Sequence, residues 1–103
     1  MGNHWPIRDD QEQEPRKRSV FSHAWPDVIM LIKEENVRAR SKHEGAPQAS
    51  ELEALSILGE EFGEVAMAIN QNLPKKELEK EIIQVASVAV RWLMGDLTFS
   101  RRP

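Results

Sequence analysis

Three stretches of the chain repeat apolar residues every three or four positions, the spacing that puts side chains on one face of an α-helix. We expect helices over residues 27–43, from residue 49 or 50 to 71, and over residues 75–94. Strands are not expected anywhere along the chain. The pattern therefore predicts an all-α fold with three main helices.

Local signals mark the ends of these helices. Asp27, directly after Pro26, is the expected N-cap of the first helix. Ser50 is followed three residues later by Glu53, which is the spacing of a capping box and predicts the start of the second helix. The expected stop signals are Gly45-Ala46-Pro47, the turn over residues 70–74, and Gly95.

The apolar face of each helix predicts how the chain packs. The face of the third helix covers more than half of its circumference, so we expect this helix to be buried on several sides. A second copy of the chain would complete the bundle, as a homodimer or homotetramer. The three expected faces are Val28, Leu31, Ile32, Glu35, Ala39 and Lys42; Leu55, Leu58, Phe62, Val65 and Ile69; and Leu78, Ile82, Ile83, Val85, Ala86, Val88, Ala89, Val90, Trp92 and Leu93.

The length of the chain, 103 residues, predicts one domain with a thin core of its own. The first 23 residues are dense in charge and low in hydrophobicity, a composition that does not offset the entropy of ordering. We expect a flexible N-terminal tail over residues 1–23, a helical domain over 24–98 and a C-terminal tail over 99–103. Phe21 and Trp25 are expected to hold the end of the first tail against the domain.

Charge and cysteine content narrow the class of protein. The net charge is −3, and residues 1–23 carry four basic and four acidic side chains, so no basic footprint for nucleic acid is present. No apolar run approaches the roughly 20 residues that span a bilayer. The chain has no cysteine, which excludes disulfides and thiolate zinc sites and fits a reducing cytoplasm. We expect a cytoplasmic protein that binds neither membrane nor nucleic acid.

Acidic residues on the second helix depart from its core pattern. Glu61 and Glu64 are three residues apart, so they project to nearly the same side, and Glu60 adjoins them. Carboxylates this close repel one another unless something positive lies between them.

A further carboxylate lies within the apolar face of the third helix. Glu81 falls among Val85, Val88 and Trp92, where a lone carboxylate is costly to bury unless it is paired or binds a cation. Gln84 projects to the same side, three residues on. Carboxylate and amide oxygens without His or Cys favour Mg²⁺ or Mn²⁺ over zinc.

The same residues fit a plainer interpretation. An acidic cluster on a helix is usually a solvated face, and Glu61 and Glu64 could pair with Lys or Arg of another helix. Glu81 could be a buried salt-bridge partner of Arg38 or Lys42. The spacing alone leaves both interpretations open.

These acids resemble a motif of the MazG-like nucleotide pyrophosphohydrolases, in which Glu-Glu-x-x-Glu on one helix is followed on the next by Glu-x-x-Asp. The segment LSILGEEFGEVA, residues 55–66, is similar to the first motif, and residues 78–93 are similar to the second helix of a short, phage-type branch. Residues 35–45 are more loosely similar to a Glu-Arg-x-Arg-Gln-x-x-Lys-Trp-Gly stretch before the first motif. The resemblance covers roughly residues 27–95.

The resemblance implies a MazG-like helical bundle that cleaves a nucleoside triphosphate between its α and β phosphates and releases pyrophosphate, in housecleaning of the nucleotide pool. It also implies a magnesium cofactor, Mn²⁺ being the alternative. One carboxylate would align or deprotonate the attacking water. The residues that it implies are Glu61, Glu64, Glu81 and Gln84 for the metal, Glu60 and Glu61 for catalysis, and Glu35, Arg38 and Lys42 for the substrate.

The chain departs from the family pattern at Gln84, which stands where the family has Asp. An amide oxygen still binds magnesium, but it carries no charge and cannot act as a base. Asn36, Ala39 and His43 also depart from the looser pattern of the first helix. The alternatives are a catalytically impaired nucleotide- or metal-binding protein of the same fold, and a structural helical oligomer whose acids pair with Arg and Lys.

Overall fold

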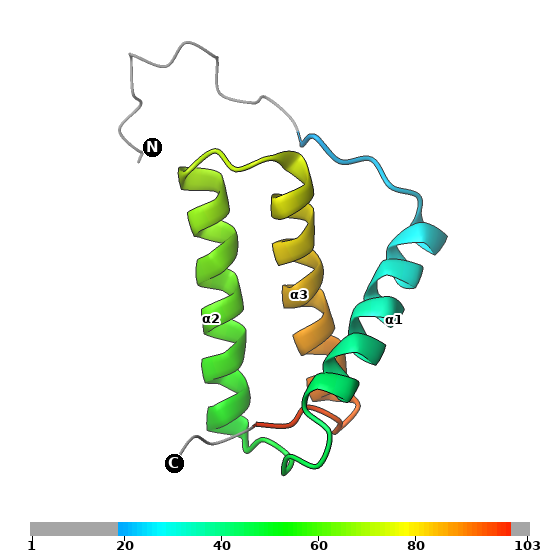
Figure 1. Ribbon diagram of the computed structural model, residues 1–103, viewed down its shortest axis with the longest axis vertical. Helices are drawn as coiled ribbons and strands as arrows, with labels where there is room; N and C mark the ends of the chain where they lie inside the picture. The colour runs from blue at the N-terminus through cyan, green and yellow to red at the C-terminus, as the bar shows by residue number, and fades with distance from the viewer. Residues whose placement is uncertain (1–18, 100–103) are drawn as a thin grey trace.

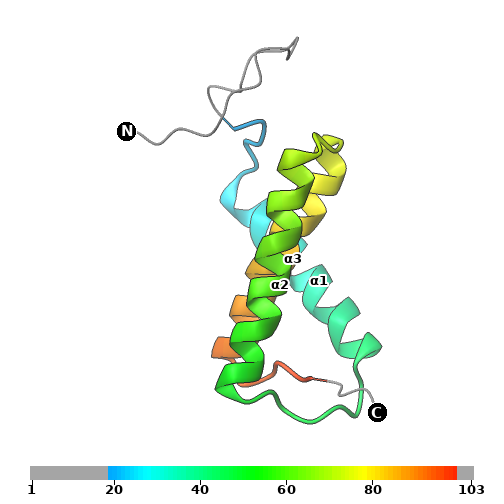
Figure 2. The same ribbon diagram turned by 90° about the vertical axis from the view of Figure 1, so that its left-hand side faces the viewer.

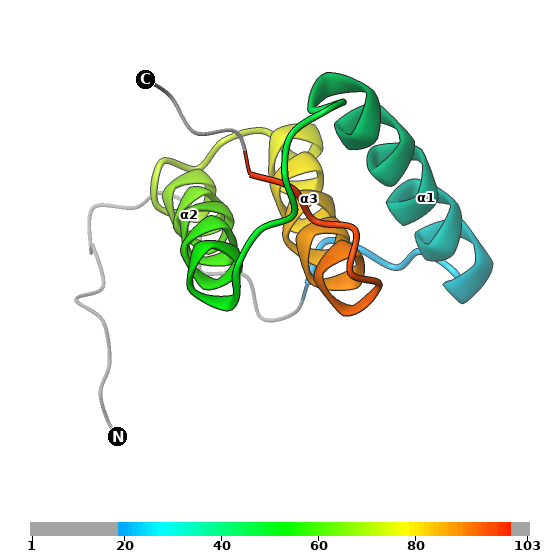
Figure 3. The same cartoon turned by 90° about the horizontal axis from the view of Figure 1, so that it is seen from below.

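The computed structural model describes residues 19–99 and places three helices in a row, with α3 between the other two (Figure 1, Figure 3). The bounds are Trp25–Lys42 for α1, Glu51–Asn70 for α2 and Lys75–Leu93 for α3. α2 and α3 run side by side, whereas α1 crosses α3 obliquely (Figure 2). α3 packs against both neighbours, but no Cα of α1 lies within 8 Å of a Cα of α2.

The predicted all-α architecture is confirmed for residues 19–99. They contain three helices and no strand, and the only β pairing among them is an isolated antiparallel bridge between Gln48 and Thr98. This bridge ties the loop before α2 to the segment after α3. None of the helices in the described part of the chain is long and apolar enough to cross a membrane.

Among the three helices, α2 alone starts with a side-chain cap. Ser50 Oγ accepts a hydrogen bond from the Glu53 backbone N–H at 3.1 Å, and the Glu53 carboxylate accepts one from the Ser50 N–H at 2.9 Å, which confirms the capping box. The predicted N-cap at Asp27 is wrong, because the cap residue of α1 is Ala24. Pro26 fits the first turn, where its missing N–H costs nothing, so the helix begins two residues earlier.

The predicted stop signals are confirmed. Gly45 after α1 has φ +86° and Gly95 after α3 has φ +72°, a left-handed conformation that glycine adopts without strain. Asn72, in the predicted turn after α2, has φ +55°, and asparagine tolerates this region better than most residues.

The hydrophobic core is small, as expected for a chain of this length. Ala54, Val88 and Leu97 form its buried centre. Trp92 packs against this centre and its indole Nε1–H donates to Glu51 at 2.6 Å, which joins the end of α3 to the start of α2. Ala49, Ile57 and Leu58 also pack against the core.

The predicted core face of α2 is wrong in part. Leu55, Phe62 and Ile69 are 57%, 68% and 57% exposed. The buried residues of α2 are Ala54 and Ala68, each seven residues from the half-buried Glu61, so the three lie in one row. α2 carries two apolar stripes, and periodicity does not tell which one the same chain covers.

The expectation for α3 is also met in part. Leu78 and Val88 are buried, in agreement with its central position. Ile82 and Leu93 are 39% and 90% exposed, so the chain alone does not bury this helix on all sides.

The predicted tails lie largely outside the described residues, which exclude 1–18 and 100–103. Phe21 contacts the start of α3, because its ring centroid lies 5.7 Å from Lys75 Nζ. Trp25 is 73% exposed, so the expectation that it holds the segment in place is wrong. The backbone N–H of Phe99 donates to the Pro47 carbonyl at 2.9 Å, so the helical domain includes residue 99.

Candidate metal centre

Three carboxylates from two helices meet between α2 and α3. Glu61 and Glu64 come from α2 and Glu81 comes from α3, and one carboxylate oxygen of each lies within 4.8 Å of those of the other two. Glu61 and Glu81 are half-buried, whereas Glu64 is exposed. The structure therefore brings together three of the four metal ligands that the family resemblance implies.

Helical spacing explains why the acids face each other. Glu61 lies seven residues from both Ala54 and Ala68, which are buried, so it belongs to the row of α2 that faces the interior. Glu81 lies three residues after Leu78 and seven before Val88, both buried, so it occupies the inward row of α3. The prediction that Glu81 lies within the apolar face of its helix is confirmed.

The proximity of these groups perturbs their protonation. The pKa of Glu61 is raised, first by burial and then by the charges of Glu64 and Glu81. The pKa of Glu81 is also raised, by burial and by a hydrogen bond with the Glu64 carboxyl group. A hydrogen bond between two carboxyl groups requires a proton on one of them, so the cluster retains a proton to a higher pH than isolated glutamates do.

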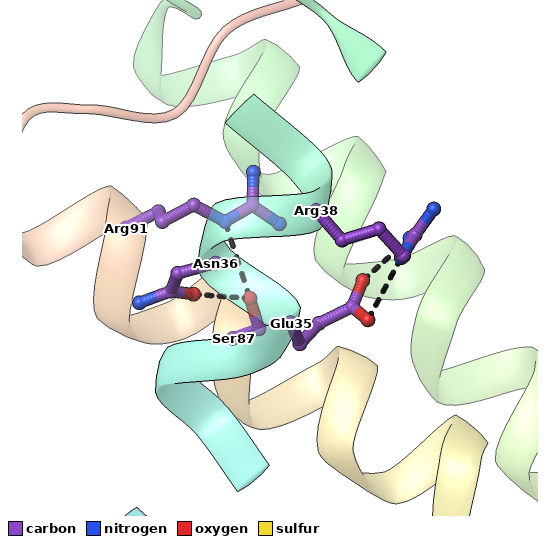
Figure 4. Close-up of polar contacts among 5 residues, drawn as sticks. All are labelled: Glu35, Asn36, Arg38, Ser87 and Arg91. Carbon is purple, nitrogen blue, oxygen red and sulfur yellow. Dashed lines mark hydrogen bonds and ion pairs between the residues drawn. The ribbon is translucent and has the colours of Figure 1, made fainter. Parts of the chain in front are cut away.

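α1 extends the charged site from the other side. Glu35 accepts hydrogen bonds from Arg38 Nε at 3.0 Å and Arg38 Nη2 at 2.5 Å (Figure 4). The negative charge of Glu35 contributes to the raised pKa of Glu61. The pKa of Arg38 is raised, chiefly by its hydrogen bond with Glu35 and to a lesser degree by the charge of Glu61. Side chains of α1 therefore act on the acidic cluster although the backbones of α1 and α2 stay apart.

A second polar group, which the sequence did not predict, joins α1 to α3. The Ser87 hydroxyl donates to the Asn36 side-chain oxygen, and Arg91 Nε–H donates to Ser87 Oγ at 3.2 Å (Figure 4). Asn36, Ser87 and Arg91 are 8%, 0% and 6% exposed. Burial of the guanidinium lowers the pKa of Arg91, an effect that the charges of Glu35 and Asp96 partly oppose.

A signal for this network was present in the sequence. Ser87 and Arg91 are four residues apart and interrupt the apolar face of α3, just as Glu81 does. In the sequence, Asn36 stands out only because it departs from the family pattern, and nothing there connects it with Ser87 or Arg91. We refer to Asn36, Ser87 and Arg91 below as the polar network.

The remaining residues that the resemblance implies differ in their exposure to solvent. Glu60 is exposed and is not one of the three acids whose oxygens converge. Gln84 is half-buried and follows Glu81 by one helical turn. Lys42 is exposed, and within residues 19–99 it forms no ion pair with a carboxylate. The alternative partner for Glu81, Arg38, forms its hydrogen bonds with Glu35 instead.

The donor set of the cluster suits a hard divalent cation. All three groups offer carboxylate oxygens, and no cysteine exists in the chain to favour a softer metal. A cation between the three groups would favour their charged forms and so oppose the rise in pKa. The residues present therefore fit Mg²⁺ or Mn²⁺.

A hollow elsewhere on the molecule does not belong to this site. It measures about 360 Å³ and is lined by Val37, Arg40, Ser41 and Glu44. Val37 and Ser41 lie on the face of α1 opposite Glu35 and Ala39, so the hollow opens away from the acids.

Comparisons of the chain with models of known protein families, with curated proteins and with solved structures gave no match.

Proposed function

We propose that this chain is a Mg²⁺-dependent nucleoside triphosphate pyrophosphohydrolase of the MazG-like kind, which cleaves between the α and β phosphates. The observation that carries the proposal is the convergence of Glu61, Glu64 and Glu81 within 4.8 Å. Three like charges at a helix interface are unfavourable alone but are suited to binding a divalent ion with a polyphosphate. The motif resemblance supplies the reaction class.

Glu61, Glu64 and Glu81 would hold the metal, with the amide oxygen of Gln84 as a neutral fourth donor. The bound ion would neutralise charge on the triphosphate and polarise its phosphoryl oxygens. Cation binding would compete with protonation of the cluster, because the metal ligand is the deprotonated carboxylate.

The attacking water requires a group that orients it and accepts its proton. Glu60 precedes Glu61 on α2 and is exposed to solvent, and its charge contributes to the raised pKa of Glu61. Glu61 lies within the cluster, where one of its carboxylate oxygens would hold the metal and the other would be left to accept a proton from a water beside it. We assign the orientation of the water to Glu60 and the acceptance of its proton to Glu61.

Arg38 is the substrate-binding residue that the geometry supports best. Its guanidinium is bonded to Glu35 along the edge formed by Nε and Nη2, while the Arg38 side chain remains 52% exposed. Glu35 thus fixes the orientation of the cation, and the remaining N–H groups can bind phosphate oxygens. Lys42, one helical turn further along α1, would add a second, more mobile positive charge.

The test is an assay of pyrophosphate release from a panel of canonical and modified nucleoside triphosphates with Mg²⁺ or Mn²⁺. We expect turnover of at least one triphosphate, and a loss on the order of 100-fold or more in Glu61→Gln. Glu34→Gln is the matched control, because Glu34 is an exposed acid of α1, and it should retain full activity. Absence of turnover for the whole panel, or equal activity of Glu61→Gln and the unaltered chain, would contradict the proposal.

Gln84 favours a second candidate function, a nucleotide- or metal-binding protein of the same fold that has lost catalysis. The amide in place of the family's Asp removes one negative charge from the site. Calorimetric binding of a nucleoside triphosphate with Mg²⁺, without any product, would select this function. Faster turnover by Gln84→Asp than by the unaltered chain would instead indicate an enzyme whose activity is reduced by the amide of Gln84.

A further inference from the structure

Of the other two helices, only α3 holds α1 in place. α1 packs on α3 and does not pack on α2, which carries two of the three acids of the cluster (Figure 1, Figure 3). The position of each α1 side chain relative to Glu61 and Glu64 is therefore set by the way α1 lies on α3.

One buried polar contact fixes the alignment of α1 on α3. Asn36 and Ala39 are the only buried residues of α1, and Asn36 accepts a hydrogen bond from the fully buried Ser87 hydroxyl (Figure 4). Ser87 in turn accepts a hydrogen bond from Arg91 Nε–H at 3.2 Å. A buried polar contact is satisfied in one alignment, whereas apolar side chains can pack in several. The polar network therefore selects one alignment of the two helices.

Two further polar links of α1 are exposed to solvent. Before the helix, His23 Nε2 lies 3.1 Å from Glu79 Oε1, and near its end Arg40 Nε–H donates to Asp96 at 2.7 Å. The side chains of both pairs are between 31% and 49% exposed. Exposed pairs contribute little to stability, so they hold α1 less firmly than the buried network does.

The selected alignment decides where Glu35 and Arg38 lie. Glu35 directly precedes Asn36, and Arg38 follows it by two residues. If the residue after Asn36 packed on Ser87 instead, α1 would be rotated by about 100° around its axis. This rotation would turn Arg38 away from the acidic cluster. In the observed alignment the pKa of Arg38 is raised by its hydrogen bond with Glu35 and also by the charge of Glu61.

Arg91 links the network to Glu35 by charge. The Glu35 side chain is only 14% exposed, so its carboxylate requires positive charge nearby. Arg38 supplies hydrogen bonds from α1, and the Arg91 side chain extends from α3 toward the same region (Figure 4). Burial lowers the pKa of Arg91, and the charge of Glu35 is the strongest influence that opposes this shift.

We propose that Asn36, Ser87 and Arg91 are positioning residues, which set the alignment of α1 on α3 and thereby hold Glu35 and Arg38 beside the acidic cluster. They act on the substrate only through Arg38. Their effect on catalysis rests on the proposed function, because it requires Arg38 to bind phosphate. Their effect on the placement of α1 does not depend on that function.

Spin labels on α1 and α2 test the placement of α1 without any substrate. The chain has no native cysteine, and Lys33→Cys with Ser56→Cys puts one label on an exposed position of each helix. Double electron–electron resonance should show a distance distribution that is broadened in Ser87→Ala by at least about 1.5 Å, the rise of one residue. Asn36→Leu, which removes the acceptor, should act in the same way. Leu97→Val is the control, because it weakens the core between α2 and α3 and should leave the distribution unchanged.

Steady-state kinetics of pyrophosphate release test the link to Arg38. Ser87→Ala should raise KM on the order of 10-fold with little change in kcat, because it misplaces a phosphate-binding group and leaves the metal-binding carboxylates in place. Arg38→Met should raise KM at least as much, and adding Ser87→Ala to it should have no further effect. Leu97→Val, which only lowers stability, should change neither constant at a temperature where the protein is folded.

The outcomes separate this proposal from the proposed function. Unchanged distance distributions in folded Ser87→Ala and Asn36→Leu would overturn it, whether or not the chain hydrolyses nucleotides. A rise in KM that Ser87→Ala causes equally with and without Arg38 would also overturn it. Absence of turnover in the unaltered chain would contradict the proposed function alone, and the spin-label distances would then decide the positioning role.

Discussion

The two sides of α3 hold their polar groups in opposite ways. On the side toward α1, a hydroxyl, an amide and a guanidinium bond one another in the polar network, and no buried side-chain nitrogen or oxygen in residues 19–99 lacks a partner. On the side toward α2, three carboxylates meet, and burial together with the neighbouring carboxylates raises the pKa of Glu61 and Glu81. The chain itself stabilises the first arrangement through complementary donors and acceptors. The second brings like charges together, so a proton or a cation that lowers its charge would stabilise it.

The largest effect on stability is expected from breaking the polar network. Ser87→Ala removes the hydroxyl that bonds both Asn36 and Arg91, and it leaves two buried polar groups without that partner. We expect the free energy of unfolding to fall by about 1–3 kcal/mol, measured by urea denaturation at neutral pH. Ser41→Ala, on the exposed face of α1, is the control and should change stability little. An equal response of the two variants would show that the network contributes nothing.

Removing a charge from the acidic cluster is expected to raise the free energy of unfolding at neutral pH, by less than the loss of the polar network lowers it. Because the pKa values of Glu61 and Glu81 are raised above their ordinary value of 4.5, these two groups bind more protons in the native state than in the unfolded chain at pH values above 4.5. Without a divalent ion, their contribution to the free energy of unfolding should therefore fall as the pH rises from 4.5 through these raised pKa values. Glu81→Gln should flatten this dependence and stabilise the protein at neutral pH, because it removes one of the repelling charges.

Thermal unfolding between pH 4.5 and 8 in the presence of a chelator measures this dependence. Glu34→Gln should retain the slope of the unaltered chain. If stability changes with pH by the same amount in the unaltered chain and in Glu81→Gln, repulsion within the cluster is too weak to matter.

The elements of the fold follow from local signals, and their packing does not. The capping box at Ser50 and the left-handed residues after each helix depend on a few neighbouring residues, so the helices were predictable to within about two residues. Which face of α2 lies inside depends on contacts with α3. The small side chains of Ala54 and Ala68 permit a close approach there, whereas the larger Leu55 and Phe62 stay outside.

The candidate site was predictable for those residues whose orientation depends on a single helix. Glu81 was recognised because an acid stood within an apolar row, and the structure brings it to Glu61 and Glu64. The polar network was not predicted, because its formation requires α1 to cross α3 at Asn36, a tertiary contact that spacing along the chain does not encode. The separation of Glu60 from the cluster likewise depends on the direction from which α3 approaches α2.

The central claim is that Glu61, Glu64 and Glu81 form a binding site for a divalent cation. Thermal denaturation at fixed protein concentration, with increasing Mg²⁺ or Mn²⁺, tests it most directly. The melting temperature of the unaltered chain and of Glu34→Gln should rise with metal, by the equivalent of about 2.7 kcal/mol when the ion is at about 100 times its dissociation constant. Glu61→Gln should show little rise. A melting temperature that metal leaves unchanged in the unaltered chain, or raises equally in Glu61→Gln, would contradict the claim.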